Sequence, residues 1–385
     1  MAARSSALGC GLNSTSTPLR LKARPCRADQ RCVGARLAVA ASLLALVHAG
    51  GAAASATPPR SWAAPQIRIV TAARVMTPAD VATFRPDDTL TAQALQDLAS
   101  ALKQALPPAS ATPAPPAPAQ VPDPARPITM AQLDTRLVQA LGLSRAAQEF
   151  AAGARSAGLK VPSRFGTEVV ARLLGLRTNH PASQDFLELL PTDKATRAEA
   201  AYSAARVLSL SGWEIPNVRA LADHFALPVL TDWQRLILNT GVARVGMPYV
   251  WGGVSDGPET AFGVTSRGGY DCSGFVWRVF KLATYPGEGS LASTLRGRTT
   301  YQMSGEVPLA QRIGFGKLEP ADVLFFGARG PASQPAQVGH TGIYLGNGWF
   351  IHSSGNGVAL TTLTGWYRNE FAWARNPLRE AGLAG

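Results

Sequence analysis

The sequence is poor in cysteine and histidine, with four and five of these residues among 385. Three cysteines precede residue 33, so the rest of the chain holds a single thiol, Cys272. A lone cysteine forms no internal disulfide, and the sequence has no C-x-x-C pair to anchor a structural zinc ion. A disulfide-stapled fold is therefore excluded for this part of the chain, and the use of Cys272 needs an explanation.

The sequence also lacks, after its first segment, any run of the ~18 consecutive apolar residues that a membrane helix needs. Residues 1–56 combine seven basic side chains, a short uncharged apolar run at 37–47 and small residues at 52–56. This order is typical of a secretory signal peptide. We therefore expect a secreted or cell-wall-associated protein that has no membrane span once this leader is removed.

Acidic residues are scarce: 25 Asp and Glu stand against 37 Lys and Arg, a formal net charge of +12. The leader holds seven basic side chains and one acidic one, so it carries +6 and leaves +6 for the remainder. A mildly basic protein is attracted to polyanionic wall polymers or a membrane face, although such a charge also serves solubility alone. The sequence shows no stripe of basic and aromatic residues and no nucleic-acid motif, so we expect no nucleic-acid partner.

Proline marks the organisation of the chain. Residues 107–127 contain nine prolines interleaved with alanine, the composition of an extended linker without a core. The flanking segments 57–106 and 128–230 are mostly helical by pattern, whereas 231–385 mixes helical and strand patterns. We predict a leader at 1–56, two helical segments separated by the linker, and a C-terminal α+β domain.

Four of the predicted helical segments begin with a threonine, a competent N-cap, at steps of 38, 38 and 29 residues. They are 91–106, 129–143, 167–176 and 196–210. The turn 84–88 (FRPDD) and the helix start 196–200 (TRAEA) resemble S-layer homology modules, whose helices open with a T-R-x-E signature. The resemblance implies docking to an anionic polysaccharide linked to the cell wall; the alternative is an ordinary helical domain rich in Ala and Leu.

The segment around Cys272 predicts a helix over 271–282 with the sulfur in its first turn. Apolar residues recur at helical spacing, which gives the helix one buried face. Asp271 or Ser273 can cap its start. Unpaired backbone N–H groups and the positive end of the helix dipole favour a thiolate there, which is the nucleophilic form of cysteine.

A pair of histidines lies on a predicted hairpin. Short strands are predicted at 323–326, 341–345 and 349–352. If 346–348 form a three-residue loop, Leu345 faces Trp349, and the imidazoles of His340 and His352 lie on one face as diagonal neighbours, about 7–8 Å apart at the backbone. A two-residue loop would place the two imidazoles on opposite faces.

These residues offer a thiol at a helix start, one histidine to take its proton and a second to orient the first, as in cysteine hydrolases. One alternative is that the histidines are structural. Another is a metal site, which would need Cys272, His340, His352 and a fourth ligand. We predict neither a metal nor a cofactor. His180 and His224 lie in helical surroundings without a pattern, and we interpret both as structural.

Five motifs, in this order, resemble those of the NlpC-type cell-wall peptidases, papain-like cysteine enzymes of the bacterial envelope. They are 248–253 (PYVWGG), 271–276 (DCSGFV), 319–326 (EPADVLFF), 339–346 (GHTGIYLG) and 351–353 (IHS). The resemblance covers about 233–376. It departs from the family pattern in two long connections, 254–270 and 284–316, and at Ala321 and Thr341.

The resemblance implies an α+β fold, in which a papain-like catalytic domain with helices packed on an antiparallel sheet follows a mostly helical region. It implies a secreted peptidoglycan hydrolase that cleaves stem peptides, at the bond from γ-D-glutamate to diaminopimelate or lysine. In this chain, Cys272 matches the nucleophile, His340 the base and His352 the residue that orients the base.

The resemblance also implies three substrate-binding residues. Tyr249 matches a tyrosine that lies over the active site, and Asp271 and Ser273 match positions that contact the substrate's amino end in some members. Two other functions stay open. The domain could be a catalytically inactive wall-binding scaffold, or an amidase or acyltransferase of the same fold.

Overall fold

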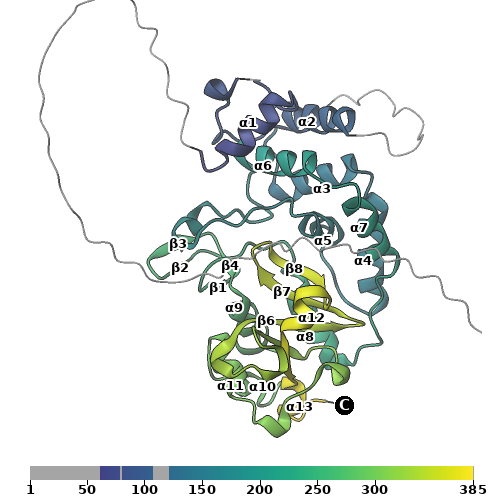
Figure 1. Cartoon of the computed structure of the whole chain (residues 1–385), viewed down its shortest axis with the longest axis vertical. Helices are drawn as coiled ribbons and strands as arrows, with labels where there is room; N and C mark the ends of the chain where they lie inside the picture. Colours follow the sequence, from purple (N-terminus) through teal and green to yellow (C-terminus); the bar gives the residue numbers. More distant parts are fainter. Residues whose placement is uncertain (1–60, 79, 107–120, 385) are drawn as a thin grey trace, which may run out of the picture. The chain divides into compact units, whose positions relative to one another are not determined.

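The computed structural model describes residues 61–78, 80–106 and 121–384 (Figure 1). These residues belong to one compact unit, Ala56–Gly385. The predicted leader and most of the predicted linker lie outside the described residues. None of the described helices is both long and apolar enough to cross a lipid bilayer.

The α+β part is built on a five-stranded antiparallel sheet of order β8-β7-β6-β5-β9. The strands are β5 (Val323–Gly327), β6 (Val338–Gly346), β7 (Trp349–Ser354), β8 (Gly357–Thr362) and β9 (Phe371–Arg375). Every residue of β5 and β9 is buried, so protein covers both faces of the sheet there. The fold class is as predicted, and the three predicted strands are parts of β5, β6 and β7.

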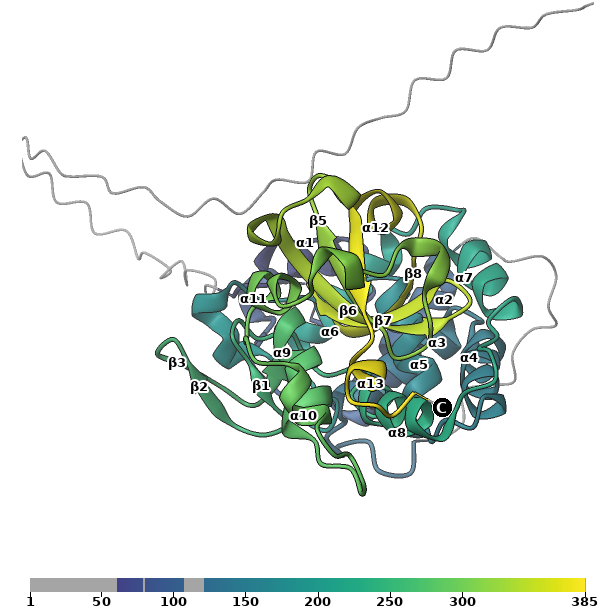
Figure 2. The same cartoon turned by 90° about the horizontal axis from the view of Figure 1, so that it is seen from below.

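Helices α8 (Asp232–Val242) and α9 (Cys272–Trp277) belong to this α+β part, and α9 packs against β6 and β7 (Figure 2). The helix predicted over 271–282 consists of α9 and one wider π-helical turn, Arg278–Leu282. Its predicted apolar face is buried; it comprises Phe275, Val276, Val279 and Phe280. Burial of this face holds the start of α9 against the sheet.

The two long connections have structure of their own. In 254–270, β1 (Val254–Ser255) pairs with β4 (Gly269–Tyr270), and β2 (Glu259–Ala261) pairs with β3 (Val264–Ser266). The connection 284–316 includes two short helices, α10 (Leu291–Thr294) and α11 (Thr300–Gly305). Towards the C-terminus lie α12 (Gly365–Glu370) and α13 (Pro377–Glu380).

The helical region contains α1 (Ala64–Ala72), α2 (Ala92–Ala105), α3 (Met130–Ala140), α4 (Ser144–Ser156), α5 (Phe165–Leu173), α6 (Arg197–Leu208) and α7 (Glu214–Asp223). Thr91, Thr129 and Thr196 cap α2, α3 and α6 through their side-chain oxygens, as predicted. The prediction that Thr167 opens a helix is wrong. Helix α5 begins two residues earlier, and the Thr167 hydroxyl donates to the carbonyl of Arg164 at 2.8 Å, within the first turn.

The backbone segments directly before α2, α3 and α6 form a closed ring of hydrogen bonds. Leu90 N–H donates to the carbonyl of Ala195 at 2.8 Å, Ala195 N–H to that of Ile128 at 2.9 Å, and Ile128 N–H to that of Leu90 at 3.2 Å. Each segment donates to one neighbour and accepts from the other. The three helix starts are therefore equivalent in an approximate threefold pattern, with Thr167 outside it.

Buried polar groups join the helical region to the α+β part. Arg172 of α5 is almost fully buried and donates to the carbonyl oxygens of Gly246 and Asn356. The buried Asp185 accepts from the backbone N–H of Trp251 at 3.0 Å. Because Trp251 belongs to the motif 248–253, the helical region helps to fix the loop that carries this motif.

Candidate active site

Cys272 is the first residue of α9, and the sequence positions it there through a side-chain cap. Asp271 has an extended backbone, and its carboxylate accepts from the N–H of Gly274, so it is the N-cap. Cys272 is partly accessible to solvent. Since α9 packs on β6 and β7, the cap faces the strands that carry the two histidines.

The surroundings of the sulfur favour the neutral thiol. Burial, and after it the Asp271 carboxylate, raises the pKa of the Cys272 thiol to about 12, against the opposing effect of the backbone N–H groups of Ser273 and Thr341. The backbone N–H groups at the helix start lower the pKa of the thiol, as expected, but burial raises it more. The contact with Thr341, which directly follows His340, nevertheless places the sulfur beside the strand of the first histidine.

The two histidines form one unit. Nε2 of His340 and Nδ1 of His352 lie 2.7 Å apart, and the two rings are nearly perpendicular at 84°. This hydrogen bond leaves Nδ1 of His340 as the ring nitrogen that can accept a proton from a thiol. Within the described part of the chain no hydrogen bond joins the sulfur to either ring, as is common where a catalytic contact closes only with substrate.

The hairpin of β6 and β7 places the two histidines on one face, as a three-residue loop would, although its loop is shorter. Its loop has two residues, Asn347 and Gly348, both with positive φ, and Gly346 pairs with Trp349. A register shift then leaves Leu345 as an extra residue in β6, a β-bulge. Such a bulge cancels the one-residue difference between a two-residue and a three-residue loop.

The register beyond the bulge explains the meeting of the two rings. Ile343 lies opposite Ile351, as a three-residue loop would have given, so Gly342 faces His352. A Cβ at Gly342 would lie 2.8 Å from Cδ2 of Phe350, 2.9 Å from the carbonyl oxygen of Ile351 and 3.0 Å from Cβ of His352, so strand β7 leaves no room for a side chain there. The predicted shared face is therefore present, and the predicted pairing of Leu345 with Trp349 is wrong.

Aromatic rings enclose the histidine pair. The ring centroids of Phe326 and His340 lie 5.7 Å apart, those of Phe350 and His352 4.7 Å apart, and those of Tyr367 and His352 5.2 Å apart. Burial lowers the pKa of His340 to about 4. Burial, and then the neighbouring His340, lowers the pKa of His352 well below its usual value. Both rings are therefore neutral at pH 7.

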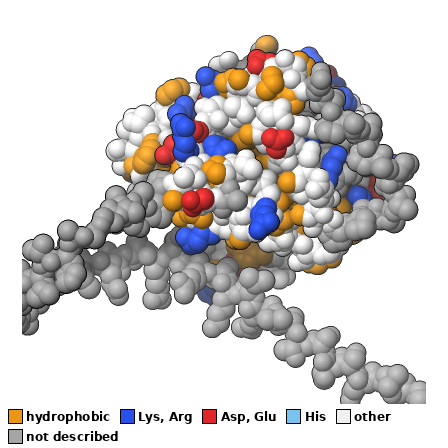
Figure 3. Space-filling view, turned by 90° about the horizontal axis from the view of Figure 1, so that it is seen from above, with side chains coloured by type: hydrophobic (Ala, Val, Ile, Leu, Met, Phe, Trp, Pro, Cys, Tyr) orange, Lys and Arg blue, Asp and Glu red, His pale blue; other side chains and the backbone are white. Residues whose placement is uncertain are grey.

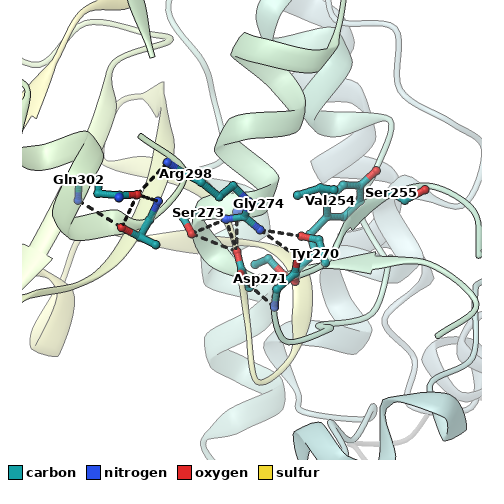
Figure 4. Close-up of polar contacts among 12 residues, drawn as sticks. Val254, Ser255, Tyr270, Asp271, Ser273, Gly274, Arg298 and Gln302 are labelled. Carbon is teal, nitrogen blue, oxygen red and sulfur yellow. Dashed lines mark hydrogen bonds and ion pairs between the residues drawn. The ribbon is translucent and has the colours of Figure 1, made fainter. Parts of the chain in front are cut away.

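Next to the sulfur, a polar cluster links the first two motifs (Figure 4). Arg298 donates to Asp271 Oδ1 at 3.1 Å and to Ser273 Oγ at 2.7 Å. The other carboxylate oxygen of Asp271 accepts from the N–H of Gly252 at 3.0 Å. Arg298 comes from the long connection 284–316 and Tyr367 from α12; neither belongs to a motif, so sequence reasoning missed both.

The remaining predicted residues are placed as follows. Tyr249 is half-buried in the loop 248–253, and its contact with substrate stays a prediction. His180 is buried, and its Nε2 lies 3.7 Å from the Glu199 carboxylate. His224 is the exposed C-cap of α7, and its Nδ1 is hydrogen-bonded to the carbonyl of Ala220. Within the described ranges, no group of three or more His, Cys, Asp and Glu side chains is arranged to hold a metal ion.

The arrangement of a cysteine at a helix start, packed on the strands that carry two histidines, is similar to that of papain-like enzymes. The NlpC/P60 family model matches residues 246–375, so this part of the chain is an NlpC/P60 domain. The domain contains Cys272, Arg298 and both histidines of the pair.

Relatives of known name match about a third of the chain. The chain is 31% identical to the γ-D-glutamyl-L-lysine dipeptidyl-peptidase of Bacillus subtilis, over 33% of this chain and 34% of that protein. It is 30% identical to the murein DD-endopeptidase MepH of Escherichia coli, over 34% of this chain and 40% of that protein. A crystal structure of an NlpC/P60 family protein from Bacillus cereus is 24% identical, covers 40% of this chain and 42% of that one, and has a TM-score of 0.29. The chain thus spans about a third of the length of these curated relatives.

Proposed function

We propose that this protein is a secreted peptidoglycan hydrolase, a cysteine endopeptidase that cleaves stem peptides through Cys272, His340 and His352. The observation that carries the proposal is the 2.7 Å pairing of the two imidazoles on the strands against which the cysteine helix packs. The substrate class is supported by relatives named as a γ-D-glutamyl-L-lysine dipeptidyl-peptidase and a murein DD-endopeptidase.

The proposed reaction begins from a neutral thiol and a neutral imidazole. Because the pKa of Cys272 is about 12 and that of His340 about 4, proton transfer accompanies the attack and does not precede it. The sulfur bonds to the scissile carbonyl carbon while its proton passes to Nδ1 of His340. The resulting imidazolium, held by His352, gives that proton to the leaving amine. Water then adds to the thioester, giving the carboxylic acid and restoring the thiol.

The scissile bond we propose is that from γ-D-glutamate to diaminopimelate or lysine. The test is digestion of purified peptidoglycan by the full chain and by Cys272→Ala, with product masses read by mass spectrometry. We expect released stem fragments from the wild type and none from the variant, whose unfolding temperature should be unchanged because Cys272 is partly exposed. Equal release by both proteins would overturn the proposal.

A second candidate function is a catalytically inactive scaffold that binds wall peptides. Purified wall separates the two: an enzyme releases stem fragments from it, whereas a scaffold binds the wall and releases none. The product masses also separate an endopeptidase from an amidase or acyltransferase, because each cuts or forms a different amide bond.

For the helical region we propose a wall-linked anionic polysaccharide as the partner. The face drawn in Figure 3 shows basic side chains scattered among apolar and polar ones, so charge density there does not mark a binding surface. A groove of about 390 Å³ between α2 and α3 is a better candidate, because Arg126, Arg136 and glutamine side chains line it. The test is co-sedimentation of the Cys272→Ala protein with purified wall. Adding Arg126→Gln and Arg136→Gln together should weaken the binding. Adding Arg145→Gln, at an exposed arginine of α4, should leave it unchanged. Equal binding by all three proteins would contradict this partner.

A further inference from the structure

Two side chains of the helical region bind the backbone of the loop 248–253. Oδ2 of Asp185 accepts from the N–H of Trp251 at 3.0 Å. The side-chain amide of Asn179, in the orientation that satisfies its neighbours, donates to the carbonyl oxygen of Tyr249 at 3.1 Å. These bonds fix the two consecutive peptide units between Tyr249 and Trp251. They therefore set the direction in which the side chain of Tyr249 leaves the loop.

The segment 177–190, which carries both side chains, is anchored in the helical region. Arg177 donates to Oδ2 of Asp134, on α3, at 3.2 Å. The backbone N–H of His180 donates to Oε1 of Glu188 at 2.6 Å, and the same oxygen accepts from the amide that binds the loop, at 3.0 Å. All four of these residues are buried. The two side chains thus reach the loop from a fixed support.

Asp185 is a buried carboxyl group that the proposed reaction does not use. Its relative exposure is 3%, and its Oδ1 is buried without a hydrogen-bond partner in the part of the chain that the structure describes. Burying a carboxyl group that is only half hydrogen-bonded costs stability. The hydrogen bond that Asp185 makes in return goes to the loop, so its benefit lies in the position of that loop and not in the packing of the helical region.

We propose that Asp185 and Asn179 are positioning residues of the active site, which hold the backbone of Tyr249 so that its side chain covers the site in the orientation that substrate requires. The inference rests on the proposed peptidase function and on the predicted substrate contact of Tyr249. Both residues act through the loop and not on the substrate. The helical region is then a working part of the catalytic unit, in addition to its proposed binding of wall polymer.

The test is a double-mutant cycle on the full chain, with the initial rate of fragment release from purified peptidoglycan as the readout. Asp185→Ala removes the acceptor for the N–H of Trp251, and we expect the rate to fall about tenfold, because small displacements of a site group are costly. Tyr249→Ala should lower the rate at least as much. If Asp185 acts through Tyr249, the double variant should be at most about threefold slower than Tyr249→Ala, whereas independent effects would multiply.

A conservative variant separates positioning from a general structural role. Asp185→Asn keeps an oxygen that can accept from the loop and removes the carboxyl group, so it should recover most of the rate that Asp185→Ala loses. The matched control is Ser183→Ala, at an exposed serine of the same segment, which should leave the rate unchanged. Unfolding temperatures are measured for every variant. If Asp185→Ala does not fold, Asn179→Ala, at a partly exposed residue, is taken through the same cycle.

The outcomes distinguish this inference from the function on which it rests. Effects that multiply in the cycle, or a wild-type rate in Asp185→Ala or Tyr249→Ala, overturn the inference and leave the peptidase proposal standing. Equal losses in Asp185→Asn and Asp185→Ala also overturn it. Purified wall that the wild-type chain leaves intact contradicts the peptidase proposal itself.

Discussion

Replacing His352 by alanine tests the histidine pair most directly. In the proposed reaction, His340 becomes positively charged, and its Nε2 keeps one partner, Nδ1 of His352 at 2.7 Å. A hydrogen bond to a charged group contributes about 1.5–3 kcal/mol, and about 1.4 kcal/mol corresponds to a tenfold change in rate. We therefore expect His352→Ala to lower kcat/KM by roughly 10- to 150-fold.

The assay should separate this loss from unfolding, because His352 is 2% exposed and packs against Phe350. Release of stem fragments from purified peptidoglycan is measured together with the unfolding temperature. His352→Asn, whose amide can both donate and accept, should recover part of the activity without a matching gain in stability. His224→Ala removes an exposed histidine far from the motifs and serves as the control. A folded His352→Ala protein with activity within twofold of the wild type would refute the role of the pair.

Three further predictions concern pH and backbone register. Because burial raises the pKa of Cys272 to about 12, its alkylation rate in the free protein should rise about tenfold per pH unit from 7 to 9; a plateau below pH 8 would contradict the neutral thiol. Burial lowers the pKa of His340 to about 4. Between about pH 6.5 and 4 the unfolded chain therefore binds more protons than the folded chain, and the free energy of unfolding should fall as pH falls through that window. His340→Gln should reduce this dependence in urea titrations, and an identical slope would exclude the assignment. Deletion of Leu345 removes the bulge but leaves Tyr344 opposite Phe350 and Ile343 opposite Ile351, so His340 and His352 should stay on one face and activity should be retained; loss of activity in a folded variant would show that the bulge itself positions the pair.

The histidine hairpin could be predicted only in part. The sequence left two arrangements open: a three-residue loop would place His340 and His352 on one face, and a two-residue loop would place them on opposite faces. The structure has the two-residue loop Asn347-Gly348, yet the extra residue Leu345 restores the register of the three-residue loop. A bulge of this kind has no local sequence signature.

Other failures have long-range causes. The helix start at Cys272 was correctly placed, but the effect of burial on the pKa of the thiol could not be predicted, because desolvation depends on what packs over the helix. Arg298 reaches the site from 26 residues beyond Cys272, through a connection with no recognisable motif. Thr167 has the right spacing for a cap, yet α5 starts two residues before it. Each of these outcomes depends on tertiary contacts that spacing and propensity do not encode.

The buried contacts of Arg172 and Asp185 limit how this chain can be divided. A fragment that starts at residue 231 would leave the carbonyl oxygens of Gly246 and Asn356, and the N–H of Trp251, without the partners they have here. A fusion of the α+β part to another protein should therefore keep residues 165–190 as well, or replace those three contacts with new ones.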